Sequence, residues 1–218
     1  MTGFTGSPRV AKGAIVGFDP VNPLASVIVF QYNPDAVTRR LTPNTAPGGR
    51  NPGEQQRLKG PPGETITMAV ELDAADQLEH AERNAVQHGI EPALASLEML
   101  LFPKSAVVIA NAALALGGLL EIVPPQAPLT ILVWGDRVVP VRITDLSISE
   151  EAFDQALHPI RAKVDLGLQV LTYDDLGLPS FGALLSLANQ QYREAQATIN
   201  GAGNVGSFVS AITQPKGG

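Results

Sequence analysis

The sequence predicts a mainly β fold, a β-barrel or β-sandwich, with accessory α-helices that include one near the C-terminus. Its clearest segment is residues 160–170, where apolar residues occupy every second position and mostly polar residues lie between them. This alternation is typical of an antiparallel strand with one buried and one solvated side. Two apolar runs before it, residues 129–133 and 137–143, flank the turn Trp134-Gly-Asp136 and predict a hairpin.

Three further strands are predicted in the first third of the chain. Residues 12–18 and 26–31 form the first two, because the proline-rich segment between them has the composition of a turn. Residues 64–72 alternate again, with four apolar side chains on the side expected to be buried. About six or seven strands in one domain favour a closed or nearly closed barrel, or a sandwich.

Helices are predicted in the middle and at the end of this domain. Residues 74–87 and 92–102 have helical character, and the apolar stripe of the second is interrupted only by Glu98. They begin a helical, Ala/Gly-rich insert over residues 74–128. A C-terminal helix is expected over residues 179–200.

Irregular composition marks the remaining segments. Residues 42–63 are rich in Pro, Gly, Asn and Arg and predict a long mobile loop, of a kind that is usually functional or ordered by a partner. Residues 1–12 predict a flexible arm, and residues 201–218 predict a Gly-rich tail. The β-barrel domain is therefore expected over residues 13–178.

Residues 105–120 form the most hydrophobic stretch. It is rich in Ala and Gly and is shorter than the roughly 18–20 apolar residues that span a bilayer. We therefore expect a buried or interface segment and no membrane insertion. The alternative, membrane association, predicts loss of the protein from the soluble fraction after lysis.

Composition limits the classes of function. The net charge of −6 argues against nucleic acid as a partner, and the absence of Cys excludes disulfides and thiolate metal sites. The absence of Cys also fits a cytosolic protein, and we expect a cytoplasmic location. Residues 1–12 do not have the pattern of a signal peptide. Charged residues make up only 17% of the chain and apolar residues 44%, which indicates surface hidden in subunit contacts and predicts an oligomer.

The titratable residues do not form a recognisable catalytic set. His80 and His88 lie eight residues apart in a charged helical stretch without metal-ligand spacing, and His158 precedes a proline in a turn. The pairs Glu150-Glu151 and Asp174-Asp175 are expected in solvated turns, because adjacent side chains do not face each other. Asp73 is expected to cap a helix. We expect no enzymatic activity, no metal and no cofactor.

Five short motifs, in their order along the chain, resemble one protein family. They are Phe30-Gln-Tyr-Asn-Pro34, Trp134-Gly135, Pro140-Val-Arg142, Glu150-Glu-Ala-Phe153 and Leu157-His-Pro-Ile-Arg-Ala162. Together they resemble the tube-domain baseplate protein of contractile injection systems, the phage-tail-like particles. The resemblance covers roughly residues 13–172.

The resemblance implies a structural protein. Such proteins carry the barrel fold of phage tail tubes and lie in the baseplate between the inner tube and the spike hub. It implies a homohexameric ring that joins hub to tube and starts tube assembly, with the spike hub protein, the inner-tube protein and other baseplate proteins as partners. Many members continue into a C-terminal LysM module. None is evident here, and the C-terminal helix is expected to take over part of its role.

Contact residues follow from this interpretation. Basic residues of the long loop suit a contact between rings, an exposed pair on the last strand suits the lumen or a neighbour, and ordinary solvent exposure is the alternative for these. The candidates for inter-ring or inter-subunit contacts are Arg50, Arg57, Lys59, Tyr32, Asn33 and Trp134, and the candidates for the lumen or a neighbour are Arg161 and Lys163.

Two alternatives remain. The first is the main inner-tube subunit of such a particle, which is disfavoured by the insert before residue 128 and by the terminal helix. The second belongs to another class, a small-ligand or carbohydrate-binding β-barrel in which Trp134, Tyr32 and Tyr173 form a stacking platform. Aromatic residues total only 5%, so such a platform is poorly supplied.

Overall fold

The computed structural model describes residues 12–18, 27–30, 33–45, 57–117, 124 and 126–213, with side chains described up to residue 205. Seven antiparallel strands form one sheet in the order β2-β1-β5-β6-β7-β4-β3. The strands are β1 (Ala14–Phe18), β2 (Val27–Val29), β3 (Val37–Thr42), β4 (Gly63–Asp73), β5 (Leu129–Trp134), β6 (Arg137–Phe153) and β7 (Pro159–Val170).

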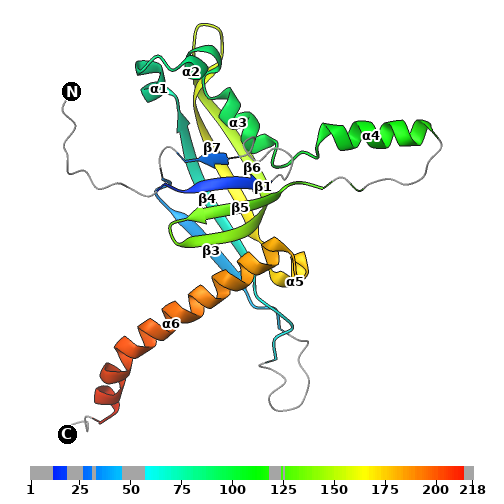
Figure 1. Cartoon of the computed structure of the whole chain (residues 1–218). Helices are drawn as coiled ribbons and strands as arrows, with labels where there is room; N and C mark the ends of the chain where they lie inside the picture. Colours follow the sequence, from blue (N-terminus) through cyan, green and yellow to red (C-terminus); the bar gives the residue numbers. More distant parts are fainter. Residues whose placement is uncertain are drawn as a thin grey trace.

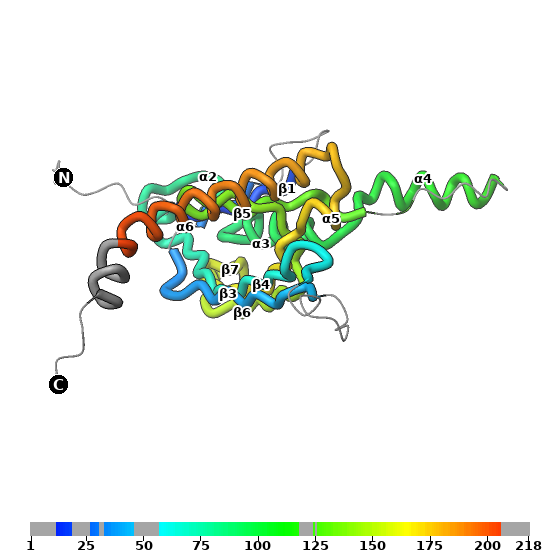
Figure 2. The backbone as a smooth tube through the Cα atoms, turned by 90° about the horizontal axis from the view of Figure 1, so that it is seen from below, coloured from blue at the N-terminus to red at the C-terminus, as the bar shows by residue number. Residues whose placement is uncertain are grey.

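The sheet bends into two facing layers. In Figure 1, β1 and β5 run across β4 and β7 at a steep angle, and the view from below in Figure 2 places β1 and β5 on one side and β3, β4 and β7 on the other. The 17-residue β6 pairs with β5 near its start and with β7 beyond it, and a bulge lies between Ile143 and Asp145. A bulge bends a strand and increases its twist, which allows one strand to serve both layers.

The sheet does not close into a hydrogen-bonded barrel within the described residues. β2 and β3 end the strand order, and no pairing joins them. The expected antiparallel sheet and C-terminal helix are confirmed. The expectation of a mainly β protein is too narrow, because α6 (Phe181–Thr213) alone has 33 residues and the architecture mixes α and β.

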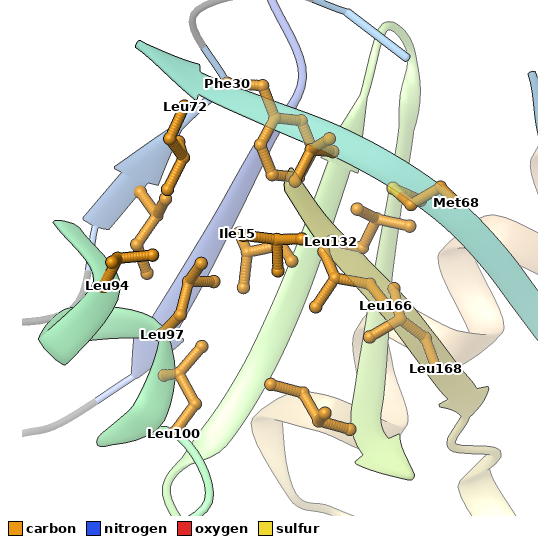
Figure 3. Packing of buried hydrophobic residues seen from close by; sticks show 14 of the residues in the cluster. Ile15, Phe30, Met68, Leu72, Leu94, Leu97, Leu100, Leu132, Leu166 and Leu168 are labelled. Atoms are coloured by element: carbon orange, nitrogen blue, oxygen red, sulfur yellow. The ribbon is translucent and has the colours of Figure 1, made fainter. Parts of the chain in front are cut away.

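The hydrophobic core lies between the layers. The alternation predicted for β4 and β7 is confirmed from Ile66 to Leu72 and from Ala162 to Val170, where every second residue is buried. In β7, Ile160 is only half-buried and Gly167 is buried as well. Figure 3 shows Ile15, Phe30 and Leu132 of one layer packed toward Met68, Leu166 and Leu168 of the other. Each such side chain contributes about 1.5–3 kcal/mol when it is fully buried.

The predicted insert supplies four helices. They are α1 (Ala75–Glu79), α2 (Arg83–His88), α3 (Glu91–Glu98) and α4 (Ser105–Leu116). The helix expected over residues 74–87 is divided, because Ala81 adopts a positive φ of 51°. α3 adds Leu94 and Leu97 to the core, and Glu98, which interrupts the predicted stripe, points to solvent.

Two helices extend away from the sheet. α4 has no buried residue, and Figure 1 shows it projecting to one side of the strands. The expectation that residues 105–120 are buried is therefore wrong within a single chain for Ser105–Leu116, while an interface role stays a prediction. α6 packs against β6 at its beginning and then runs outward as far as Thr213, past the predicted helix end at residue 200.

Three local predictions also differ from the structure. β3 was not predicted, because none of its residues is buried and its Arg and Thr side chains give no apolar alternation. Glu150 and Glu151 lie inside β6 and not in a turn. Asp174 and Asp175 lie in α5 (Tyr173–Leu176), where Asp175 accepts hydrogen bonds from the backbone N–H and hydroxyl of Thr172.

Candidate functional site

Trp134 and Asn33, two predicted contact residues, stabilise the start of β1. The Trp134 ring lies 6.5 Å from the Phe30 ring between centroids, and a Cβ on Gly13 would come within 2.5 Å of the indole. Asn33 Oδ1 accepts a hydrogen bond of 3.1 Å from the Gly13 N–H. The structure therefore brings Trp134 and Asn33 together around Gly13, and their role between subunits stays a prediction.

Arg57 and Lys59 lie on the second limb of the predicted long loop. The two limbs continue the β3–β4 hairpin, since Thr45 and Leu58 form a β-bridge and the Lys59 N–H donates to the Asn44 carbonyl at 2.9 Å. Both basic side chains are exposed. Two further candidates, Arg50 and Tyr32, lie outside the described residues. So do residues 1–11 of the predicted arm and residues 214–218 of the predicted tail, whereas residues 201–213 belong to α6.

Arg161 and Lys163 share the outer face of β7. Arg161 donates to Asp73 Oδ2 at 2.7 Å, and this hydrogen bond raises the pKa of Arg161. Lys163 lies 3.2 Å from Glu151 on β6. Both cations are exposed and paired with acids of their own chain. The Asp73 carboxylate also accepts a hydrogen bond of 2.7 Å from the Ala75 N–H. Asp73 lies one residue before Ala74, which is the N-cap of α1.

A buried carboxylate at the start of β4 was not predicted. Glu64 at the start of β4 is only 4% exposed in its side chain. Its Oε1 accepts from Arg39 of β3 at 2.7 Å, and its Oε2 accepts from Arg193 of α6 at 2.6 Å. Both oxygens are therefore used, and the ion pairs fasten α6 to the far edge of the sheet.

Arg137 completes this group at the start of β6. Partial burial lowers the pKa of Arg137, and the neighbouring charges of Arg39 and Arg193 lower it further, while Glu64 and Tyr192 act in the opposite direction. We call Glu64, Arg39, Arg193 and Arg137 the Glu64 cluster. It gathers charges from β3, β4, β6 and α6 at one end of the molecule.

One signal in the sequence pointed to Glu64. It precedes Ile66 by two positions, so the alternation of β4 places its side chain on the buried face. A buried carboxylate requires cationic partners. Those partners are separated from Glu64 by 25 and 129 residues, and spacing alone does not identify them.

A cavity of about 540 Å³ lies beside the cluster, between the hairpin limb and α6. Its wall includes Glu64 and Arg193 of the cluster together with Lys59, Tyr173 and Asn189. The Asn189 Oδ1 atom is buried and has no hydrogen-bond partner in the described part of the chain. A polar ligand or an ordered water would satisfy it.

The remaining candidate surface consists of the α4 helix and the edge strand β2, which both expose apolar side chains. α4 exposes Val108, Ile109 and Leu116, the last to 91%, and its residues carry no charge. At one sheet edge, Val27 and Val29 of β2 are about half exposed. Covering these apolar groups with another protein would lower the free energy, because apolar surface is removed from water.

The histidines remain in local structure. His80 hydrogen-bonds the Asp76 carbonyl, and His158 lies 3.0 Å from Asp154 and 6.4 Å from the His88 ring. Over the described ranges, no group of three His, Cys, Asp or Glu residues is arranged to hold a metal ion. In the same ranges, no helix has both the length and the hydrophobicity to cross a membrane.

Comparison of the chain with protein-family models and with curated proteins found no match. The geometry of the fold and the five sequence motifs are therefore the basis for assigning a function to this protein.

Proposed function

We propose that this chain is a structural subunit of a contractile injection system, which forms a ring between the spike hub and the inner tube and initiates tube assembly. Two observations support the proposal. The five motifs resemble those of this family, and the fold exposes a helix and strand edges to which neighbouring subunits could bind. It involves no catalytic step. The expected ring is a homohexamer that works in the cytoplasm as part of the assembled particle.

The exposed α4 helix is the observation that carries this proposal. Twelve uncharged residues without a buried side chain are costly to leave in water, and α4 makes few contacts with its own chain. Burial of α4 against a neighbouring subunit would explain why this exposed helix carries no charged residue. The exposed β2 and β3 edges support the same conclusion, because lateral packing in a ring protects such edges.

The carbohydrate-binding alternative has less support. Trp134 packs against Phe30 and Gly13 of its own chain, and Tyr173 lines the cavity beside the Glu64 cluster. A stacking platform needs a flat aromatic face that is open to a sugar. The Trp134 ring is partly used in the packing of this chain.

Negative-stain microscopy with sedimentation velocity tests the proposal. The purified protein is examined alone and mixed with the spike hub protein. Six-fold rings in either sample are the expected result, because closed rings repeat one heterologous contact around an axis. Monodisperse monomers in both samples would contradict the proposal.

A further inference from the structure

The Glu64 cluster contains more positive than negative charge. Three guanidinium groups surround one carboxylate, and both oxygens of that carboxylate already accept from Arg39 and Arg193. Arg137 has no ion pair within the described residues. Its lowered pKa follows from burial and then from repulsion by the other two arginines. An added negative charge would therefore stabilise this end of the protein.

The adjacent cavity continues the excess of positive charge. Arg193 belongs both to the cluster and to the cavity wall, and Lys59 contributes a second cation to that wall. Two acids lie near this wall: Asp174 lies close to Gly60, and Asp175 accepts a hydrogen bond from the hydroxyl of Thr172, which lines the cavity. Four cations, Arg39, Arg137, Arg193 and Lys59, against the three carboxylates of Glu64, Asp174 and Asp175 leave one positive charge.

The wall also provides unused hydrogen-bonding groups. Asn189 has a buried side-chain oxygen without a partner in the described chain, and rotating its amide by half a turn would present the NH₂ group instead. Arginine, lysine and amide N–H groups together are the donors that bind carboxylates and phosphates. A volume of about 540 Å³ is ample for one such group.

We propose that this cavity binds an oxyanion, a carboxylate or a phosphate group, held by Arg193, Lys59 and the Asn189 amide and balancing the excess charge of the Glu64 cluster. In an assembly the oxyanion is a carboxylate from a neighbouring protein, and in isolation it is a free anion. The site depends on the charges of this chain and not on the ring proposed above.

Calorimetric titration of the full chain with inorganic phosphate tests the site directly. Sodium chloride at the same ionic strength provides the reference for nonspecific screening. The wild type is expected to bind phosphate, and Lys59→Gln is expected to raise the dissociation constant about tenfold, as loss of one charged hydrogen bond does. Arg142→Gln is the matched control, because Arg142 pairs with Gln169 away from the cavity and its loss should leave binding unchanged.

Failure of the wild type to bind either phosphate or hexaglutamate would overturn the proposal. Equal weakening of binding in Lys59→Gln and Arg142→Gln would overturn it as well. Hexaglutamate, with hexaglutamine as the neutral reference, distinguishes the two sources of the oxyanion. Tighter binding of hexaglutamate than of phosphate supports the site with a protein carboxylate as its occupant. Binding of phosphate alone supports it with a free anion.

Thermal unfolding of Arg137→Gln gives a second readout. In chloride this substitution removes repulsion from Arg39 and Arg193, so its midpoint is expected to lie above that of the wild type. In phosphate the bound anion should reduce or reverse this advantage. The same difference between variant and wild type in both salts would count against an anion at the cluster.

Discussion

Single residues determine how α6 is joined to the sheet. Glu64 is nearly inaccessible, yet it is charged and sits in line with the apolar side chains of β4. Its desolvation is offset only because Arg39 and Arg193 each supply a charged donor within 2.7 Å. One carboxylate therefore connects the edge strand β3 with the C-terminal helix.

Glu64→Gln should lower the free energy of unfolding by about 3 kcal/mol, because it leaves partly buried guanidinium groups without their counter-charge. Urea denaturation followed by circular dichroism measures this change. Glu71→Gln is the matched control on the exposed face of the same strand, and it should change stability by less than about 0.5 kcal/mol. Equal midpoints for the two variants would contradict a structural role for the cluster.

Asp154 should make the turn between β6 and β7 sensitive to acid. Its carboxylate accepts from the backbone N–H groups of His158 and Ala156 and lies 3.0 Å from the His158 ring. The hydrogen bond from the His158 backbone is the main cause that holds the pKa of Asp154 below its ordinary value, with the His158 ring and Ala156 adding to it.

A depressed pKa means that this stabilisation is full above the unfolded-state pKa, about 3.9, and is lost as the pH falls through the lower folded-state pKa. Asp154→Asn should therefore be less stable than the wild type at pH 7, and the difference should shrink below about pH 4. Urea midpoints measured from pH 7 to pH 2.5 provide the test. A difference that stays constant over this range would show that the carboxylate charge is not responsible.

At the scale of elements, the helices divide into two kinds. α3 turns Leu94 and Leu97 into the core and closes one end of the space between the layers. The sequence of α4 is more hydrophobic than that of α3, but none of its residues is buried. Hydrophobicity alone therefore does not decide which helix is buried.

Ile109→Lys should separate assembly from folding. Ile109 on α4 is 68% exposed, so the lysine should change the free energy of unfolding by less than about 0.5 kcal/mol. It should, however, reduce or abolish ring formation with the hub protein, because a charge would be buried in the contact. Urea denaturation and sedimentation velocity measure the two effects.

Val86→Lys on α2 is the control for this substitution, with a similarly exposed apolar residue on a helix that stays close to the sheet. Rings formed equally well by Ile109→Lys and the wild type would show that α4 lies outside the contact.

At the scale of the whole molecule, the sheet leaves two edges for pairing. β2 at one end has three residues, and β3 at the other carries Arg39 and Arg40. Short edge strands and charged side chains both discourage uncontrolled strand addition. A regulated contact at these edges therefore needs a partner of matching shape, as in a closed ring.

Val29→Lys should weaken lateral association of the subunits. Val29 is 53% exposed on β2, and a lysine on an edge strand opposes close approach of another chain. We expect monomers that retain the wild-type circular dichroism spectrum and no longer form rings in electron micrographs. Leu157→Lys, in the turn between β6 and β7, is the control and should leave the rings intact; rings of Val29→Lys would exclude β2 from the contact.

The sequence by itself determined the strands with strict alternation, the hairpin around Trp134, the helical insert and the C-terminal helix, because each of these depends on neighbours within a few residues. The exposed strand β3 and the continuation of β6 through Glu150-Glu151 were missed because their side chains carry little apolar signal. Only the tertiary structure decided that α4 lies exposed and that Glu64 meets Arg39 and Arg193. Those contacts join residues far apart in the chain, and they exist only after the bent sheet has brought β3, β4, β6 and α6 to the same end.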